Sequence, residues 1–173
     1  MRKGAAAAGS AVFFLAAPMV VTGVVPWWLT GGWDAGRSWL LPVRIAGWAV
    51  LVGSAALLIH SFARFVVQGL GTPAPVAPTE HLVVTGAYRY VRNPMYVAVV
   101  ALILAQGLVL SRPLLLGYGG LAWAVMATFV RIYEEPTLRR QFGAEYGAYR
   151  GAVRGWVPVL RAYRSAPPPR PFP

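Results

Sequence analysis

Two polar clusters interrupt an otherwise apolar sequence, and both contain residue types that bind ligands. The first, TGAYRYVRNPMY, runs from Thr85 to Tyr96 and holds two arginines, three tyrosines and an Asn-Pro pair. The second begins with the pair Glu134 and Glu135. Carboxylates bind hydroxyl and ammonium groups, and the faces of tyrosine rings attract cations. The two clusters could therefore hold a polar ligand.

A purely structural explanation of the same residues is also available. Arginines such as Arg89 and Arg92 collect on the cytoplasmic side of a membrane, and tyrosines collect at its interface. The Glu pair could then simply neutralise neighbouring arginines. Composition alone leaves both explanations open.

The composition indicates that most of this chain lies in lipid. Of the 173 residues, 57% are hydrophobic and 12% are charged, which is too apolar for an ordinary soluble domain. We therefore attribute the formal net charge of +11 to the orientation of the protein in the membrane. Nucleic-acid binding is a poorer explanation, because no soluble domain of useful size carries the charge. Cysteine is absent, which excludes disulfides, thiolate metal sites and thiol nucleophiles. We expect no nucleic-acid partner and no metal.

Four apolar segments predict an all-α integral membrane protein with four transmembrane helices. They cover residues 5–29, 45–67, 95–110 and 114–133. A helix of about 20 residues crosses the ~30 Å hydrocarbon core of a bilayer. Only Ser-Arg-Pro joins the last two segments, so these helices must be antiparallel neighbours. His60, inside the second segment, is expected to bond a neighbouring helix or a water molecule.

The distribution of arginine predicts how these helices are oriented. The N-terminus, the first polar cluster and the C-terminal segment place more positive charge at one membrane face than Arg37 and Arg112 place at the other. Cytoplasmic faces of membrane proteins carry such an excess. We therefore expect a protein of the inner cell membrane with both termini in the cytoplasm.

A further helix is predicted after the hairpin, in the cytoplasm or on the membrane surface. One of its faces is apolar, through Leu138, Phe142, Tyr146, Tyr149 and Val153. Gly143, Gly147 and Gly151 line another stripe, where they allow either close packing or the approach of a flat ligand. The sequence thus divides into an N-terminal helix pair (1–68), a Pro/Gly loop (69–80), a core (81–160) and a disordered Pro-rich tail (161–173).

Two longer motifs carry a resemblance to a known family. The run HLVVTGAYRYVRNPMY is followed, one helical hairpin later, by EEPTLRRQFGAEYGAYRGAVRGWVP. Together they resemble the isoprenylcysteine carboxyl methyltransferase family, which is related in architecture to the phospholipid N-methyltransferases. The resemblance covers residues 80–158. It implies an integral membrane enzyme that uses S-adenosylmethionine, with residues 81–160 as its methyltransferase core.

The same resemblance implies the residues of the site. The cofactor pocket would take His81, Leu82, Val83, Val84, Tyr88, Asn93, Pro94, Met95 and Tyr96 from the first motif, and Glu134 and Glu135 from the second. Arg131 falls near the position of a substrate-binding arginine, and many members carry histidine where this chain has Asn93. Arg131 and Asn93 are therefore the candidate catalytic residues. Asparagine does not titrate near neutral pH, so proton transfer by that histidine has no counterpart here.

The chemistry of methyl transfer does not identify the acceptor. Methyl transfer is an in-line displacement, which needs aligned reactants and exclusion of water. A carboxylate acceptor needs an arginine such as Arg131 to position it, whereas an amine needs a way to lose its proton. The sequence favours methylation of a lipophilic acceptor, in the manner of the carboxyl methyltransferases. The alternatives are a phospholipid-type N-methyltransferase and a lipid-binding membrane protein without enzymatic activity.

Overall fold

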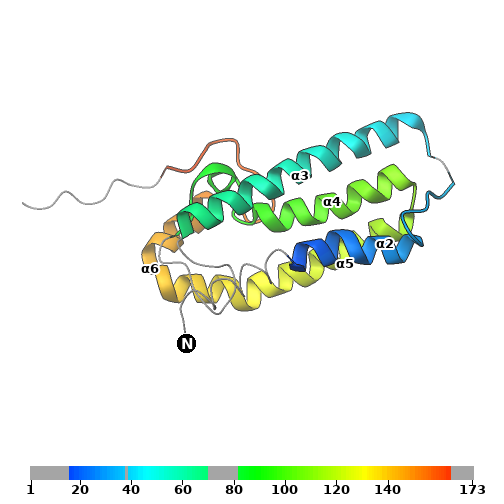
Figure 1. Ribbon diagram of the computed structural model, residues 1–173. Coiled ribbons are helices and arrows are strands. Elements are labelled where there is room, and N and C mark those ends of the chain that lie inside the picture. The colour runs from blue at the N-terminus through cyan, green and yellow to red at the C-terminus, as the bar shows by residue number, and fades with distance from the viewer. Residues whose placement is uncertain (1–15, 38, 70–81, 165–173) are drawn as a thin grey trace, which may run out of the picture.

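The computed structural model describes residues 16–37, 39–69 and 82–164, and these residues form helices, turns and loops without a strand (Figure 1). An apolar helical segment, Ala16–Thr30, ends with α2 (Val25–Thr30). It is followed by α3 (Leu41–Gly69), α4 (Pro94–Leu110), α5 (Pro113–Phe129) and α6 (Glu135–Ala152). The all-helical expectation is confirmed for the described residues. Most of the Pro/Gly loop and the first part of the predicted first helix lie outside them.

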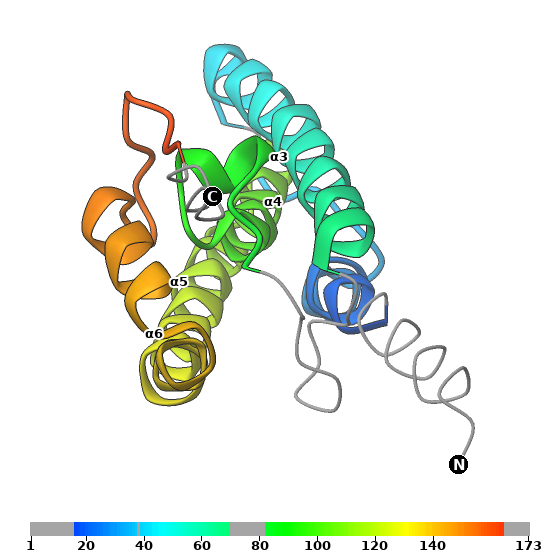
Figure 2. The same ribbon diagram turned by 90° about the vertical axis from the view of Figure 1, so that its left-hand side faces the viewer.

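Helix α4 is the centre of the bundle and packs between α3 and α5 (Figures 1 and 2). Its buried apolar residues are Ala98, Val99, Ile103, Ala105 and Val109. They point in several directions around the helix, as expected of a helix that is covered on all sides. The expected antiparallel hairpin is formed by α4 and α5.

Glycines allow the neighbouring helices to approach α4 closely. A side chain at Gly47 of α3 would place its Cβ 2.9 Å from the Cβ of Leu108. One at Gly119 of α5 would place its Cβ 2.6 Å from Cδ2 of Leu104. Both separations are shorter than van der Waals contact, so a side chain at either position would force its neighbour to move. Small residues at helix contacts are typical of membrane bundles.

The outward faces of the helices are covered by large apolar side chains. Examples that are more than half exposed are Trp28, Ile45, Val52, Ile59, Leu121, Val125 and Ile132. Soluble monomers rarely expose so large an apolar surface. Among the described helices, Leu41–Arg64 and Pro113–Ala152 are long and apolar enough to span a membrane, and Ala16–Thr30 and Pro94–Leu110 are apolar but shorter. Two spans are therefore of full length in the described residues, and four spans stay a prediction.

Helix α5 continues further than the sequence suggests. The apolar segment was expected to end at Tyr133, with a separate helix from Glu134 onwards. Instead a π turn, Val130–Glu134, joins α5 to α6 without a break. A kink at Gly143, whose φ of 50° and ψ of −121° are not helical, interrupts the long helix, and residues 113–142 before the kink are roughly 45 Å long, which exceeds the ~30 Å hydrocarbon core of a bilayer. The hydrocarbon core can therefore accommodate about the first 20 residues of this helix. Glu134 follows these residues and lies beyond the hydrocarbon core.

Proline explains both π turns in the described chain. The turns Val20–Val24 and Val130–Glu134 each end two residues before a proline, Pro26 and Pro136. Proline has no N–H to donate and its ring clashes with the carbonyl four residues earlier, so the preceding turn widens. The carbonyl that Pro26 leaves free, that of Thr22, accepts a hydrogen bond from Nε2 of Gln106 at 2.9 Å. A neighbouring helix thus replaces the missing backbone bond.

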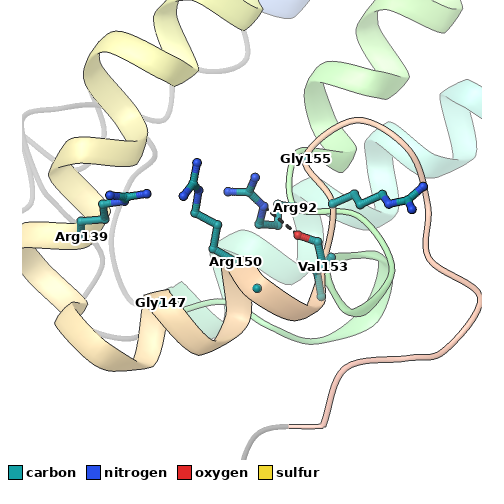
Figure 3. A pocket seen from close by; sticks show the side chains of 8 residues that line it. Arg92, Arg139, Gly147, Arg150, Val153 and Gly155 are labelled. Atoms are coloured by element: carbon teal, nitrogen blue, oxygen red, sulfur yellow. Dashed lines mark hydrogen bonds between the residues drawn. The ribbon is translucent and has the colours of Figure 1, made fainter.

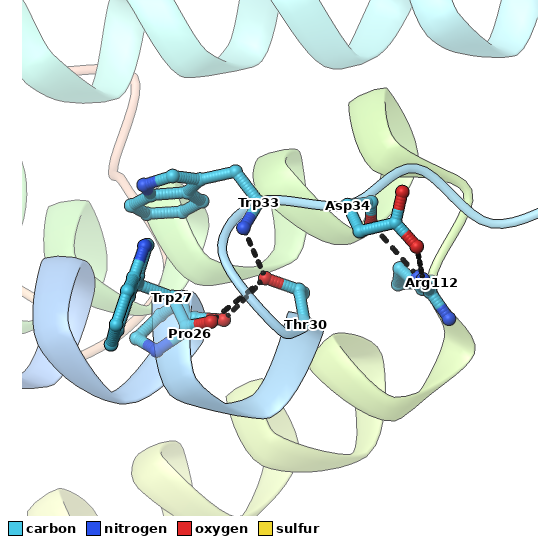
Figure 4. Close-up of polar contacts among 6 residues, drawn as sticks. All are labelled: Pro26, Trp27, Thr30, Trp33, Asp34 and Arg112. Atoms are coloured by element: carbon cyan, nitrogen blue, oxygen red, sulfur yellow. Dashed lines mark hydrogen bonds and ion pairs between the residues drawn. The ribbon is translucent and has the colours of Figure 1, made fainter.

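The end of the bundle opposite to the two polar motifs is fastened by a small polar network (Figure 4). Arg112 donates to a carboxylate oxygen of Asp34 at 2.7 Å and to its carbonyl at 2.9 Å. The hydroxyl of Thr30 accepts from the backbone N–H of Trp33 at 3.0 Å. This network neutralises Arg112 and fixes the turn between α2 and α3.

Candidate functional site

A hydrogen bond joins the two polar motifs at one end of the α4–α5 hairpin. The hydroxyl of Tyr96 donates to Oε1 of Glu134 at 3.2 Å, across 38 positions of sequence. Tyr88 is buried beside them. Burial raises the pKa of Tyr88, and the nearby Tyr149 and Glu134 raise it further. Tyr88 therefore remains a neutral hydroxyl at physiological pH.

Glu134 is partly buried and has an unusual acidity. Burial raises the pKa of its carboxyl to about 6; the hydrogen bond from Tyr96 acts against this shift and the charge of Glu135 adds to it. The group is therefore mostly ionised at neutral pH, and it takes up a proton in mildly acidic solution. Carboxyl groups perturbed by burial are common at functional sites.

Glu135 has a different environment from its neighbour. One of its oxygens accepts from Nη1 of Arg92 at 2.9 Å and the other from Nε of Arg150 at 3.2 Å. Consecutive residues of a helix point roughly 100° apart, so the two carboxylates face different groups. Glu134 alone contacts Tyr96. The explanation that the Glu pair neutralises arginines therefore applies to Glu135.

Asn93 directly precedes α4, where Pro94 is well placed because the first turn needs no proline N–H. The backbone N–H of Asn93 donates to the carbonyl of Gly155 at 3.2 Å. Its side-chain Nδ2 is buried and has no hydrogen-bond partner among the described residues. An unpaired buried donor costs about 1–3 kcal/mol. Such a donor suits a site that receives a polar ligand.

The other residues expected at the site differ in burial and in the groups that they contact. Leu82 and Val84 pack against the buried cluster of Tyr146, Tyr149 and Val153, and Val83 is itself buried. Met95 is half-buried in the first turn of α4. Arg131 is exposed and makes no hydrogen bond or ion pair with any described residue. His81 lies outside the described residues.

Two aromatic residues outside the predicted set, Trp156 and Trp123, extend the site. The ring of Trp156 lies 6.4 Å from that of Tyr96 and 6.1 Å from that of Trp123, measured between centroids. Trp123 is half exposed on the outer face of α5. An aromatic row, Tyr96–Trp156–Trp123, thus leads from the partner of Glu134 to the outside of the bundle. The only sequence signal for Trp156 is its place at the end of the second motif.

The chain after α6 returns to the first motif and forms backbone hydrogen bonds with it. Backbone N–H groups of Arg92, Val159 and Tyr163 form hydrogen bonds of 2.8–2.9 Å between the two segments. The side chain of Arg92 donates to the carbonyl of Val153 and to the hydroxyl of Tyr146, both at 2.9 Å. Arg92 therefore connects the first motif to α6 and to the segment after it, and its role is not limited to contact with lipid headgroups. The tail expected from residue 161 begins inside this fastened segment, because Tyr163 packs on Tyr149 with ring centroids 5.2 Å apart.

His60 contacts the first motif from α3. Gly86 has a positive φ of 58°, and a side chain there would place its Cβ 2.8 Å from Nε2 of His60. Glycine at this position is required both by the backbone and by the neighbouring ring. The histidine was expected to contact another helix or water, and its neighbour is the short 3₁₀ helix Gly86–Arg89 of the first motif.

A cavity of about 430 Å³ opens beside this cluster, between α6 and the segment that follows it (Figure 3). Its charged lining residues are Arg92, Arg139, Arg150 and Arg154. Glu134, Tyr88 and Tyr96 are not among the lining residues. The arginine cavity and the Tyr96–Glu134 pair are thus separate features, connected through Arg92 and Glu135.

Fold and site together describe a helical membrane protein with a polar site at the end of a helix hairpin. The family model "Phospholipid methyltransferase" matches residues 42–145, well over half of the chain. The chain belongs to this family. No curated protein matches it. The match confirms the family relationship indicated by the motifs, and it indicates a membrane methyltransferase without distinguishing phospholipid-type from carboxyl-type members.

Proposed function

We propose that this protein transfers a methyl group from S-adenosylmethionine to a lipophilic acceptor at the membrane interface. The observation that carries the proposal is the 3.2 Å hydrogen bond between Tyr96 and Glu134. It joins two motifs that, by the resemblance to the carboxyl methyltransferases, would surround one cofactor. Membership of the phospholipid methyltransferase family supports the same reaction class.

The residues present suit this cofactor. S-adenosylmethionine supplies a methyl group on a positively charged sulfur when it is bound. The carboxylate of Glu134 can accept hydrogen bonds from its hydroxyl or ammonium groups, and the unpaired Nδ2 of Asn93 can donate to one of its acceptors. The faces of Tyr96 and Trp156 provide aromatic surface for a cation. We therefore assign Glu134, Asn93, Tyr96 and Trp156 to cofactor binding.

The aromatic row gives an acceptor a route from the lipid. Trp123 lies on the outer face of α5, where a lipid chain can reach it, and Trp156 connects it to Tyr96. A hydrophobic acceptor could thus enter laterally while the cofactor arrives from water. Exclusion of water by these rings would also favour the displacement.

Two acceptor classes fit this arrangement. Arg131 is exposed three residues before Glu134 and could hold an acidic group, either a carboxylate or the phosphate of a phospholipid. A carboxylate is already a nucleophile, whereas an amine must first lose a proton, and Glu134 with a pKa of about 6 is a weak base for that step. We therefore put carboxyl O-methylation first. N-methylation of a phospholipid amine is the second candidate, since "Phospholipid methyltransferase" is the description of the matching family.

The charge distribution supports a cytoplasmic location for the site. Arginines are concentrated at the end of the bundle that holds the two motifs, while Arg112 at the opposite end is paired with Asp34. By the positive-inside rule, this end and both termini would face the cytoplasm of the inner membrane.

The test is transfer of radiolabelled methyl groups by the purified protein in nanodiscs supplied with a lipid extract. A methyl ester is released by mild base, whereas an N-methyl group is not, so base treatment distinguishes the two candidates. Loss of transfer in Glu134→Gln is expected. Absence of both transfer and cofactor binding in the wild-type protein would support the alternative of a lipid-binding protein without enzymatic activity.

A further inference from the structure

The arginine cavity concentrates positive charge in a small space. Figure 3 shows the guanidinium groups of Arg92, Arg139 and Arg150 directed toward the same region, and Arg154 also lines the cavity. Arg92 and Arg150 share one carboxylate, that of Glu135. Arg139 and Arg154 have no ion pair with any described residue. The three guanidinium groups that converge in Figure 3 carry two more positive charges than the carboxylate of Glu135 neutralises, and Arg154 adds a further positive charge to the lining.

The floor of the cavity is kept open by glycine. Gly147 and Gly151 of α6 line it, and a Cβ added at either position would meet no atom within 4 Å. Close packing, one of the two explanations for this glycine stripe, therefore does not account for these two residues. Their effect is to leave the space in front of the arginines free.

We propose that this cavity binds a phosphate group. Guanidinium groups hold phosphate through paired hydrogen bonds, and a phosphate brings enough negative charge to offset much of the excess. The volume of about 430 Å³ exceeds that of the phosphate alone and leaves room for the group attached to it. That group is either a lipid headgroup or a soluble molecule. The inference does not depend on methyl transfer, because the residues assigned to the cofactor do not line the cavity.

The experiment is isothermal titration calorimetry on the full chain in an uncharged detergent at low salt. The probes are short-chain phosphatidylglycerol, inorganic phosphate and a short-chain uncharged glycolipid. We expect the two phosphate probes to bind and the glycolipid not to bind. Phosphatidylglycerol binding more tightly than inorganic phosphate assigns the site to a lipid headgroup, and equal affinities assign it to a soluble phosphate compound.

Matched variants separate specific binding from general charge attraction. The double variant Arg139→Gln, Arg154→Gln should bind the phosphate probes at least about tenfold more weakly, as expected for loss of charged hydrogen bonds. The control, Arg140→Gln with Arg161→Gln, removes two exposed arginines that do not line the cavity. Its affinity should stay within about twofold of wild type, since it tests long-range attraction alone.

A second variant keeps every charge. Gly147→Leu fills the floor of the cavity and should weaken phosphate binding while the thermal transition stays close to that of the wild type. If the double variant Arg139→Gln, Arg154→Gln fails to fold, Gly147→Leu provides the test in its place. The proposal is overturned if neither phosphate probe binds, if the control pair loses as much affinity as the cavity pair, or if S-adenosylmethionine displaces the bound phosphate.

Discussion

Glu134 and Glu135 are adjacent in sequence but have different neighbours. Glu134 accepts from Tyr96 and lies beside Tyr88, whereas Glu135 binds Arg92 and Arg150. The first carboxylate keeps one oxygen without a described partner, and the second has both oxygens engaged. Their substitutions should therefore affect different properties of the protein.

Glu134→Gln should weaken binding of S-adenosylmethionine by about 1–3 kcal/mol, the cost of losing a hydrogen bond to a charged group. Calorimetry on the purified protein measures this directly. Glu135→Gln is the matched control, because it should lower thermal stability through Arg92 and Arg150 and leave cofactor affinity nearly unchanged. Unchanged affinity in Glu134→Gln, with a loss in Glu135→Gln, would reverse the assignment.

Cofactor affinity should also depend on pH through Glu134. Its pKa in the free protein is raised to about 6, and the cofactor binds the ionised form in our proposal. Affinity should thus be nearly constant above pH 7 and fall as the pH drops through 6, by about tenfold per unit at the acidic limit. Titrations between pH 5 and pH 8 test this, with cofactor binding as the readout. Glu134→Gln should remove the dependence, and a dependence that persists in this variant would point to another group.

At the scale of the elements, contact between α4 and α5 sets the position of both motifs. Glycine controls this contact, because Gly119 lies against Leu104 whereas the next residue, Gly120, faces open space. The two positions therefore differ in surroundings while sharing a residue type and a helix.

Gly119→Leu should lower the stability of the protein by about 1–3 kcal/mol, because its Cβ would lie 2.6 Å from Cδ2 of Leu104 and force the helices apart. Thermal unfolding in detergent measures the effect. Gly120→Leu adds the same side chain where no atom lies within 4 Å, and it should leave the transition almost unchanged. Equal shifts of the unfolding transition in the two variants would show that helix propensity, and not packing against α4, determines the change in stability.

At the scale of the whole molecule, the arginine-rich end and the site coincide. The two motifs, α6 and the segment after it lie together at one end of the bundle, and the Asp34–Arg112 pair lies at the other (Figures 1 and 4). If four helices span the membrane, both termini share the side of the site.

We therefore expect a C-terminal reporter to remain in the cytoplasm. Alkaline phosphatase, which is active only outside the cytoplasm, should be inactive when fused after residue 173 and active when inserted near Asp34. A fluorescent protein that folds in the cytoplasm should give the opposite result at each position. Phosphatase activity at the C-terminus would contradict the orientation that the arginines predict.

The sequence by itself determined the helices and the family. Long apolar runs must form helices in lipid because their backbone groups have no other partners, so α3 and α4 lie close to their expected bounds. The Ser-Arg-Pro link fixed the antiparallel hairpin by its length. The motifs and their order indicated the family that the model match confirms.

The tertiary structure decided which side chains meet. Tyr96 contacts Glu134 and not Glu135 because the π turn before Pro136 sets the rotation of the helix, and residue spacing does not report such a turn. Trp156 joins the site only because the chain after α6 returns along the first motif, through hydrogen bonds between residues more than 60 positions apart. The open space at Gly147 and Gly151 is likewise a property of packing, since glycine is compatible with both close contact and a cavity.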